Sequence, residues 1–181
     1  MIEIISGTNR PKSRTIQISQ LVESIVQQQM PCNMIDLAEL NFSSTLSEFS
    51  FDKTHNNHAV RLWQQSRLIP SNHWIIVVPE YNGSFPGILK VWIDALSTQD
   101  AKDTFFGKKI GLIGVSSGRS GNVRGLDHLT SILHYLDVNV FPFKLPISSV
   151  DSLLLKNGEY HNDLISPVSD FVQKYIQFIC E

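Results

Sequence analysis

The segment from residue 6 to residue 15 carries more hydrogen-bonding chemistry than a plain turn requires. It reads Ser6-Gly7-Thr8-Asn9-Arg10-Pro11-Lys12-Ser13-Arg14-Thr15. A helical pattern follows, and the amide groups and dipole of a helix N-terminus attract an anion, while the Arg10 guanidinium can bond two phosphate oxygens. The alternative is N-capping by Ser13 or Thr15 with solvated cations, but capping needs one hydroxyl and no group of cations. Neither Walker A nor G-x-G-x-x-G is present, which favours a single phosphate.

A second polar corner follows the apolar run Trp74–Val78. It reads Pro79-Glu80-Tyr81-Asn82-Gly83-Ser84. Gly83, with Gly87 beyond it, lets the backbone approach a flat ligand closely, and Tyr81 offers an aromatic face. A tight strand-to-helix turn capped by Ser84 is the simpler alternative, but such a turn needs less varied chemistry. We therefore interpret this corner as the wall of a ligand pocket.

A third corner is rich in small residues and contains the G-x-S-x-G pattern. It reads Gly114-Val115-Ser116-Ser117-Gly118-Arg119-Ser120-Gly121-Asn122. As a nucleophile elbow it would make the chain a serine hydrolase that uses Ser116, with Asp151 and His161 in the required order. The pattern is short, however, and no HGGG-type oxyanion loop occurs early in the chain. The hydrolase interpretation also leaves the first two corners without a role, so we keep it as an alternative.

The three corners follow apolar, β-rich runs of the kind found in strands that are buried on both faces of a parallel sheet. Strands are expected at Ile2–Ser6, His73–Val78, Lys109–Val115 and Val138–Phe143, with a weaker candidate at Asn33–Leu37. Helical patterns occupy Thr15–Met30, Ala59–Ile69, Ile88–Leu96, Val123–Leu136 and Val168–Ile179. This alternation predicts a three-layer α/β fold: a doubly wound, five-stranded parallel sheet with helices on both faces. Such sheets bind ligands at the carboxyl ends of their strands, where the three corners would meet.

Length and composition fit one ordinary globular domain that spans residues 1–181. The net charge is −2 and no long basic run occurs, which excludes a typical nucleic-acid binder. No apolar run is long enough to cross a membrane, no signal peptide is evident, and only two cysteines are present, so we expect a cytoplasmic protein. The polar segment Asn41–Asn57 is the expected long loop or lid. His55 and His58 alone make no metal site, because zinc needs three or four ligands.

Together the corners resemble the NADPH-dependent FMN reductase family, a branch of the flavodoxin-like fold that includes small quinone, azo-dye and chromate reductases. The family's first loop reads roughly G-S-x-R-x-x-S-x-N, which residues 7–15 match with threonine at the second and last positions. Its second signature, P-E-Y-N-x-S-x-P-G-x-L-K-N-x-I-D, is matched nearly throughout by residues 79–94. The resemblance in strand and helix order extends from residue 1 to about 180.

The resemblance implies that the chain binds FMN and uses NADPH or NADH as hydride donor. It implies that the phosphate is bound by Thr8, Arg10, Ser13 and Thr15. It implies that the isoalloxazine ring is lined by Pro79, Glu80, Tyr81, Asn82 and Gly83, and that the far side is closed by Ser116 and Gly118. It also implies that hydride passes from NAD(P)H to flavin N5 and then, in ping-pong order, to a small-molecule quinone, azo, metal or flavin acceptor, with no catalytic side chain required. Family members are usually homodimers or homotetramers.

Besides the two threonines of the first loop, the chain departs from the family pattern in three places. Val91 stands where asparagine is common and Trp92 where a small residue is frequent, so acceptor choice and subunit packing can differ. The third loop also has one glycine fewer than many family versions. Besides the hydrolase, a second alternative is an FMN-binding electron-transfer module without its own NADPH turnover. Against the module, a net charge of only −2 gives no strongly acidic docking surface.

Overall fold

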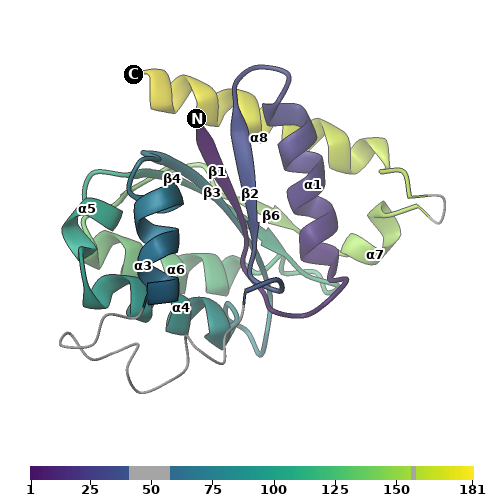
Figure 1. The fold of residues 1–181 in the computed structure, drawn as a ribbon. Coiled ribbons are helices and arrows are strands. Elements are labelled where there is room, and N and C mark those ends of the chain that lie inside the picture. The colour runs from purple at the N-terminus through teal and green to yellow at the C-terminus, as the bar shows by residue number, and fades with distance from the viewer. Residues whose placement is uncertain (41–57, 156–157) are drawn as a thin grey trace.

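A computed structural model describes residues 1–40, 58–155 and 158–181. Its centre is a parallel sheet built from β1 (Ile2–Ser6), β2 (Cys32–Asp36), β3 (His73–Pro79), β4 (Lys109–Val115), β5 (Asn139–Val140) and β6 (Leu145–Ile147). The strand order is β2-β1-β3-β4-β5, and β6 pairs with β4 as well (Figure 1). This 2-1-3-4-5 order belongs to flavodoxin-like sheets, whose direction of winding reverses between β1 and β3.

The helices form the two outer layers, as predicted. One face of the sheet is covered by α1 (Arg14–Val26) and α8 (Asn162–Cys180), with the short α7 (Val150–Leu153) at its edge (Figure 1). The other face is covered by α3 (His58–Trp63) and its π-helical continuation (Gln64–Leu68), α4 (Gly87–Thr98), α5 (Ala101–Phe105) and α6 (Val123–Tyr135). The two helix layers give one apolar core on each face of the sheet.

Side-chain alternation along the strands explains why the core has two halves. On β1, Ile4 packs under α1 and α8, whereas the next residue, Ile5, packs toward the α4 layer. On β3, Ile75 and Ile76 divide in the same way. Because every second residue points to the same face, a strand covered on both sides must be apolar throughout. That requirement explains the unbroken apolar runs of β1, β3 and β4.

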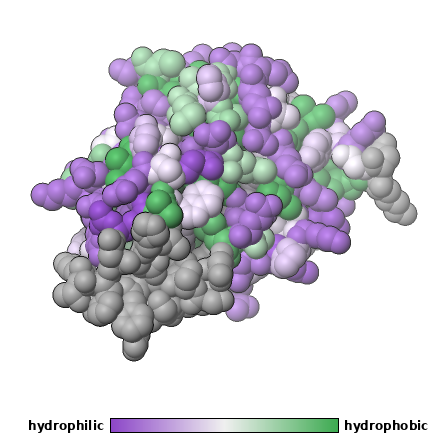
Figure 2. Space-filling model, viewed as in Figure 1, coloured by the Kyte–Doolittle hydropathy of each residue, from purple (hydrophilic) through white to green (hydrophobic). Residues whose placement is uncertain are grey.

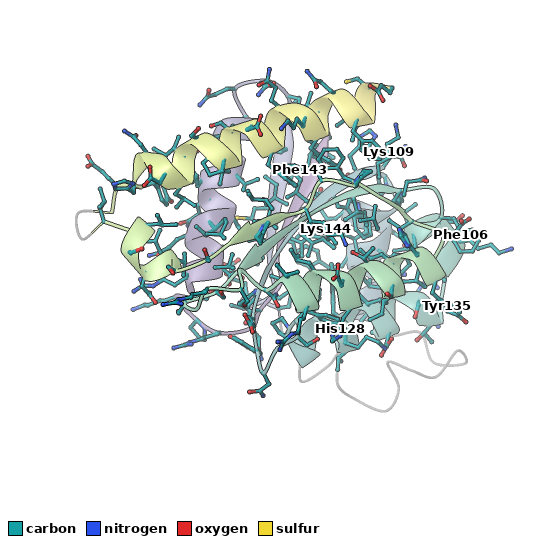
Figure 3. The ribbon with its side chains drawn as sticks, turned by 180° about the vertical axis from the view of Figure 1, so that it is seen from behind. Phe106, Lys109, His128, Tyr135, Phe143 and Lys144 are labelled. Atoms are coloured by element: carbon teal, nitrogen blue, oxygen red, sulfur yellow. The ribbon has the colours of Figure 1, made fainter. Side chains whose placement is uncertain are left out.

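The fifth position of the sheet differs from the expected single strand Val138–Phe143. It is shared by β5, which pairs with the start of β4, and by β6, which pairs with the end of β4. Pro142 interrupts the ladder because proline has no N–H to donate. The chain bulges there, and Phe143 leaves the sheet to pack beside α8, where the Lys174 ammonium lies 4.7 Å from its ring centroid (Figure 3).

Helix boundaries also differ from the expected ones at several ends. Helix α8 begins six residues before the expected start, with the His161 side chain accepting a hydrogen bond from the Asp163 amide. Pro167 therefore lies inside the helix rather than before it. Helix α1 ends at Val26 instead of Met30. The short helices α5 and α7 have too few residues to show a helical period in the sequence.

Polar groups fix the end of the sheet opposite the three corners. Glu3 on β1 is fully buried and receives bonds of 2.7 and 3.2 Å from the Arg67 guanidinium. Lys108, which precedes β4, is also buried and donates to the carbonyl oxygens of Leu68 and Ile69 at the end of the π-helical turn. Burial lowers the pKa of Lys108 below its ordinary value. These bonds join the π-helical turn to β1 and to the residue before β4.

The expected loop Asn41–Asn57 lies outside the described residues. Among the residues described, no helix combines the length and apolar character needed to span a bilayer. On the face that Figure 2 presents, hydrophobic residues are dispersed among hydrophilic ones.

Candidate functional site

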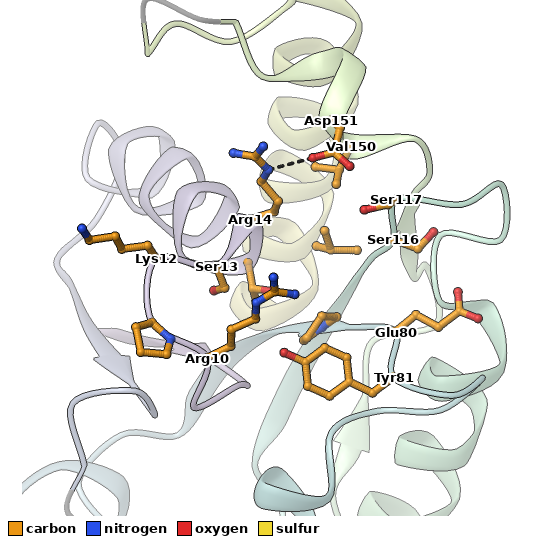
Figure 4. A pocket seen from close by; sticks show the side chains of 14 residues that line it. Arg10, Lys12, Ser13, Arg14, Glu80, Tyr81, Ser116, Ser117, Val150 and Asp151 are labelled. Atoms are coloured by element: carbon orange, nitrogen blue, oxygen red, sulfur yellow. Dashed lines mark hydrogen bonds and ion pairs between the residues drawn. The ribbon is translucent and has the colours of Figure 1, made fainter.

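The three corners converge at the carboxyl ends of β1, β3 and β4, around a cavity of about 460 Å³ (Figure 4). A cavity of this size lies within the range that binds cofactors and other small molecules. Its lining is formed by the first loop, the second corner, the third loop and a segment before α7. The lining residues are Arg10, Pro11, Lys12, Ser13, Arg14, Thr15, Pro79, Glu80, Tyr81, Val115, Ser116, Ser117, Val150 and Asp151.

The first loop ends in a capped helix that presents free backbone donors to the cavity. Ser13 is the N-cap of α1, and its Oγ accepts a hydrogen bond of 3.2 Å from the Ile16 amide. The amides of Arg14 and Thr15, in the first turn, have no intrahelical acceptor. The Thr15 side chain is buried beside them, whereas Arg10 and Lys12 are exposed at the cavity. This part of the wall offers amide donors, hydroxyls and cations in one place.

The second corner folds into a tight hairpin turn. The Tyr81 amide donates to the Ser84 carbonyl, and the Ser84 amide donates to the Tyr81 carbonyl. Asn82 and Gly83 between them both have positive φ, 52° and 75°, which is the Asn-Gly pattern of a type I′ turn. The turn aims Tyr81 back at the first loop, where its hydroxyl lies 2.9 Å from Thr8 Oγ1. The flat aromatic wall is thereby joined to the loop at the other side of the cavity.

The third loop is held closed by the buried Ser116 side chain. Ser116 Oγ donates to the Gly118 carbonyl and accepts from the Gly121 amide, each at 2.9 Å. Asn122, which precedes α6, donates from its side-chain amide to the Pro79 carbonyl at 2.9 Å. Ser120 Oγ also donates to a Glu80 carboxylate oxygen. These bonds attach the third loop to the second corner, so the two form one continuous wall.

A fourth wall, from the residues after β6, was not predicted. Val150 and Asp151 line the cavity, and Asp151 Oδ1 accepts a hydrogen bond of 2.8 Å from Arg14 Nε (Figure 4). Hydrogen bonds from Ser117 and Arg14 hold the pKa of the Asp151 carboxyl below its ordinary value. Sequence patterns missed this wall because β6 contains only three residues, one of them proline. Had β6 been recognised, the segment after its carboxyl end would have been searched too.

The cavity unites most of the residues expected at the site. Its lining includes Arg10, Ser13, Thr15, Pro79, Glu80, Tyr81 and Ser116. Four expected residues do not contribute to the lining: Thr8, Asn82, Gly83 and Gly118. Thr8 is fully buried between the Tyr81 hydroxyl and the Arg10 amide, which donates to its Oγ1 at 3.3 Å. Its position therefore supports the two residues that do line the cavity.

Ser116, Asp151 and His161 do not form a hydrolase triad. Its hydroxyl proton is directed to the Gly118 carbonyl, and Asp151 is bonded to Arg14. The third member, His161, accepts from the Asp163 amide at the start of α8. Each of the three groups thus has a partner outside the triad, whereas a nucleophile needs its base within hydrogen-bond reach.

The donor set fits a phosphate monoester attached to a flat ring system. Helix amides, hydroxyls and the Arg10 guanidinium suit a phosphate at one end of the cavity. Tyr81 and the tight Asn82–Gly83 turn suit a planar group at the other end. FMN combines these two parts in one molecule. Among the described residues, no cluster of histidine, cysteine or acidic side chains could hold a metal ion.

Comparisons with known proteins agree with this chemistry. Residues 1–150 match the NADPH-dependent FMN reductase family. A 2-hydroxy-1,4-benzoquinone reductase from Burkholderia sp. is 26% identical over 177 residues, 97% of this chain and 90% of the relative. An FMN-dependent NADPH-azoreductase from Staphylococcus saprophyticus is 28% identical over 166 residues, 87% of this chain and 82% of the relative.

A solved structure extends the likeness to the fold. The flavoenzyme FerB, an NAD(P)H:(acceptor) oxidoreductase from Paracoccus denitrificans, superposes with a TM-score of 0.78 at 17% identity. The superposition covers 98% of this chain and 96% of FerB. At that identity the likeness establishes the flavodoxin-like fold, while the family match covers the first loop, the second corner and the third loop. The chain therefore belongs to the NADPH-dependent FMN reductase family and is an oxidoreductase that uses FMN with NAD(P)H.

Proposed function

We propose that the chain passes electrons from NAD(P)H to a small-molecule acceptor in ping-pong order, through FMN held in the cavity at the carboxyl ends of the strands. The observation that carries the proposal is the cavity itself, with a phosphate-type wall at α1 and a flat aromatic wall at Tyr81. Bound FMN would supply the redox chemistry, by accepting a hydride and returning two electrons. The acceptor class is a quinone, an azo compound, a metal oxyanion or free flavin.

The protein side chains have binding and orienting roles in this proposal. Arg10 and the free amides of the first α1 turn neutralise the phosphate, whose charge is roughly −1.5 to −2. Pro79, Glu80 and Tyr81 line the ring through the second corner, and the Asn82–Gly83 turn keeps this backbone close to it. Ser116 and Gly118 hold the third loop on the opposite side by their mutual hydrogen bond. Ser13 and Thr15 add hydroxyl groups at the cavity, while the buried Thr8 positions Tyr81 and Arg10.

The acceptor proposal is supported by the curated relatives. One is named a quinone reductase and another an azoreductase, and both align with most of this chain. Quinones and azo compounds are flat, so either can follow the nicotinamide at an open face of the same ring. Val91 and Trp92 on α4 also differ from the usual family pattern, but neither lines the cavity, and Trp92 is buried in the core under α4.

A visible absorption spectrum tests the proposal. The purified protein is soaked with FMN and desalted, and its spectrum is recorded before and after anaerobic addition of NADPH. We expect flavin bands that survive desalting and then bleach. Bands that persist with both NADPH and NADH would support the electron-transfer module instead. Absence of bands would contradict retained FMN, and steady-state assays with added FMN would then test whether it exchanges as a substrate.

We also propose a homodimer or homotetramer. Large apolar side chains that are exposed in the single chain support this, notably Phe106 at 45% and Tyr135 at 88% exposure (Figure 3). Val123, at the start of α6 beside the third loop, is 47% exposed. Light scattering on the FMN-loaded protein measures the assembly, and a monomer would contradict the proposal.

A further inference from the structure

The charged side chains at the cavity near the start of α1, where the phosphate would bind, are not all cationic. Arg10, Lys12 and Arg14 reach the cavity from the first loop and the start of α1, but Asp151 reaches it from the opposite side. Figure 4 shows Arg14 turned toward Asp151, while Arg10 extends separately from the first loop. Within the described part of the chain, Arg10 and Lys12 have no acidic partner. An acidic side chain facing a phosphate site therefore needs an explanation.

Stability is not a sufficient explanation for the Arg14–Asp151 pair. Its N–O distance is 2.8 Å, but the two side chains are 51% and 53% exposed. Ion pairs exposed to this degree contribute little to folding, because water screens the attraction and ordering two side chains costs entropy. Asp151 nevertheless receives bonds from both Arg14 and Ser117, which keep its carboxylate at the cavity.

The two charges of the pair have opposite effects on a bound phosphate. Arg14 attracts it and Asp151 repels it, and because the two groups are held 2.8 Å apart, their effects on a nearby phosphate largely cancel. Attraction is then left to Arg10, Lys12 and the α1 amides. Resting on the proposed function, we propose that Asp151 offsets Arg14 and thereby weakens the site for the FMN phosphate, which makes bound FMN easier to exchange.

Isosteric variants separate this role from a structural one. Asp151→Asn removes the charge but keeps an oxygen that can accept from Arg14 and Ser117. Dissociation constants are measured by flavin fluorescence for FMN and for riboflavin, which has the same ring and no phosphate. The set comprises wild type, Asp151→Asn, Arg14→Gln and the double variant. Asp170→Asn, which breaks an exposed pair with Lys174 on α8, is the matched control.

The expected changes have opposite signs for the two single variants. Asp151→Asn tightens FMN binding roughly threefold to tenfold, the effect of one screened unit charge beside a phosphate. Arg14→Gln weakens it by a similar factor, because Asp151 is left uncompensated. The double variant returns to within about twofold of wild type, as two offsetting charges should. Riboflavin binding is unchanged throughout, and the gain in Asp151→Asn shrinks at high salt.

Two outcomes would overturn the inference while the proposed function stands. In the first, Asp151→Asn does not tighten FMN binding. Weaker binding would make Asp151 a positioning residue, and unchanged binding would mean that it has no role at the phosphate. The other is an equal shift for riboflavin, which would indicate an altered pocket shape. A wild-type protein that binds FMN no better than riboflavin would instead contradict the phosphate site, and the inference would fail with it.

Discussion

Arg10 occupies a different electrostatic position from its neighbour Arg14, and the difference can be measured. Arg10 is exposed at the cavity without a carboxylate partner among the described residues, so its full charge is available to a phosphate. A hydrogen bond to a charged group contributes about 1.5–3 kcal/mol, so Arg10→Ala should weaken FMN binding by about 10-fold to 150-fold. Equilibrium titration with FMN checks the size of the loss.

Folding of the Arg10→Ala apoprotein should be close to that of wild type. Surface substitutions away from caps and buried networks usually change the unfolding free energy by no more than about 0.5 kcal/mol. Denaturant unfolding of both apoproteins provides this control. A collapsed fold would mean that Arg10 supports the loop itself, and the loss of FMN could no longer be assigned to the phosphate.

Ser116 gives a second prediction at the level of one side chain. Its replacement by alanine leaves the buried Gly121 amide without its acceptor, which costs about 1–3 kcal/mol of folding free energy. The exposed Ser117, replaced in the same way, should change stability by less than about 0.5 kcal/mol. Reductase turnover with saturating FMN should survive in Ser116→Ala. If the wild type hydrolysed esters and Ser116→Ala did not, the hydrolase interpretation would be supported instead.

Among the structural elements, the join between β4 and the third loop depends on close backbone packing. A Cβ atom on Gly114 would overlap the carbonyl oxygen of Gly121 and lie 3.0 Å from a Leu126 methyl group. Gly114→Ala should therefore destabilise the protein by about 1–3 kcal/mol and weaken FMN binding, because the third loop must move. Thermal unfolding and FMN titration measure the two effects.

Gly118 provides the matched control in the same loop. A Cβ atom there meets nothing within 4 Å, and its φ is not in the left-handed region. Gly118→Ala should leave stability within about 0.5 kcal/mol of wild type. If Gly114→Ala and Gly118→Ala destabilised the protein equally, steric overlap at Gly114 would not be the cause.

The elements also show what the sequence could predict. Strands β1 and β4 have the predicted bounds, because burial on both faces leaves an unbroken apolar run. The fifth strand position was wrong in detail, since Pro142 divides it into β5 and β6 and neither short piece shows a period. The Arg14–Asp151 pair was missed with it, because residues that meet only through the fold leave no local pattern. The second corner was predictable because its turn chemistry is contiguous.

At the scale of the whole molecule, a histidine at the end of the sheet opposite the cavity should make the stability depend on pH. His73 begins β3 near the N-terminus, Lys109 and Lys108, and burial, followed by these cations, lowers its pKa below 6.5. The unfolded chain therefore binds a proton at higher pH than the folded chain does. Stability should be unaffected above pH 6.5 and should fall as the pH drops from there through the folded pKa.

Replacement of His73 tests the predicted loss of stability at low pH. His73→Gln should flatten the decline in melting temperature between about pH 7 and pH 5, and should leave the slope above about pH 7.5 unchanged. Melting temperatures measured by circular dichroism across this range provide the comparison. If wild type and variant decline in parallel, the acid sensitivity belongs to other groups.

FMN binding should also stabilise the whole fold, because the four chain segments that line the cavity come together only in the folded protein. A ligand present at 100 times its dissociation constant stabilises the folded state by about 2.7 kcal/mol. For a chain of 181 residues each kcal/mol raises the melting temperature by about 2–4 °C, so this FMN concentration should raise it by about 5–11 °C. Riboflavin at the same concentration should raise it less, because it lacks the phosphate that α1 and Arg10 bind. Equal shifts with both flavins would mean that the ring alone holds the cofactor, and the first loop would lose its proposed role.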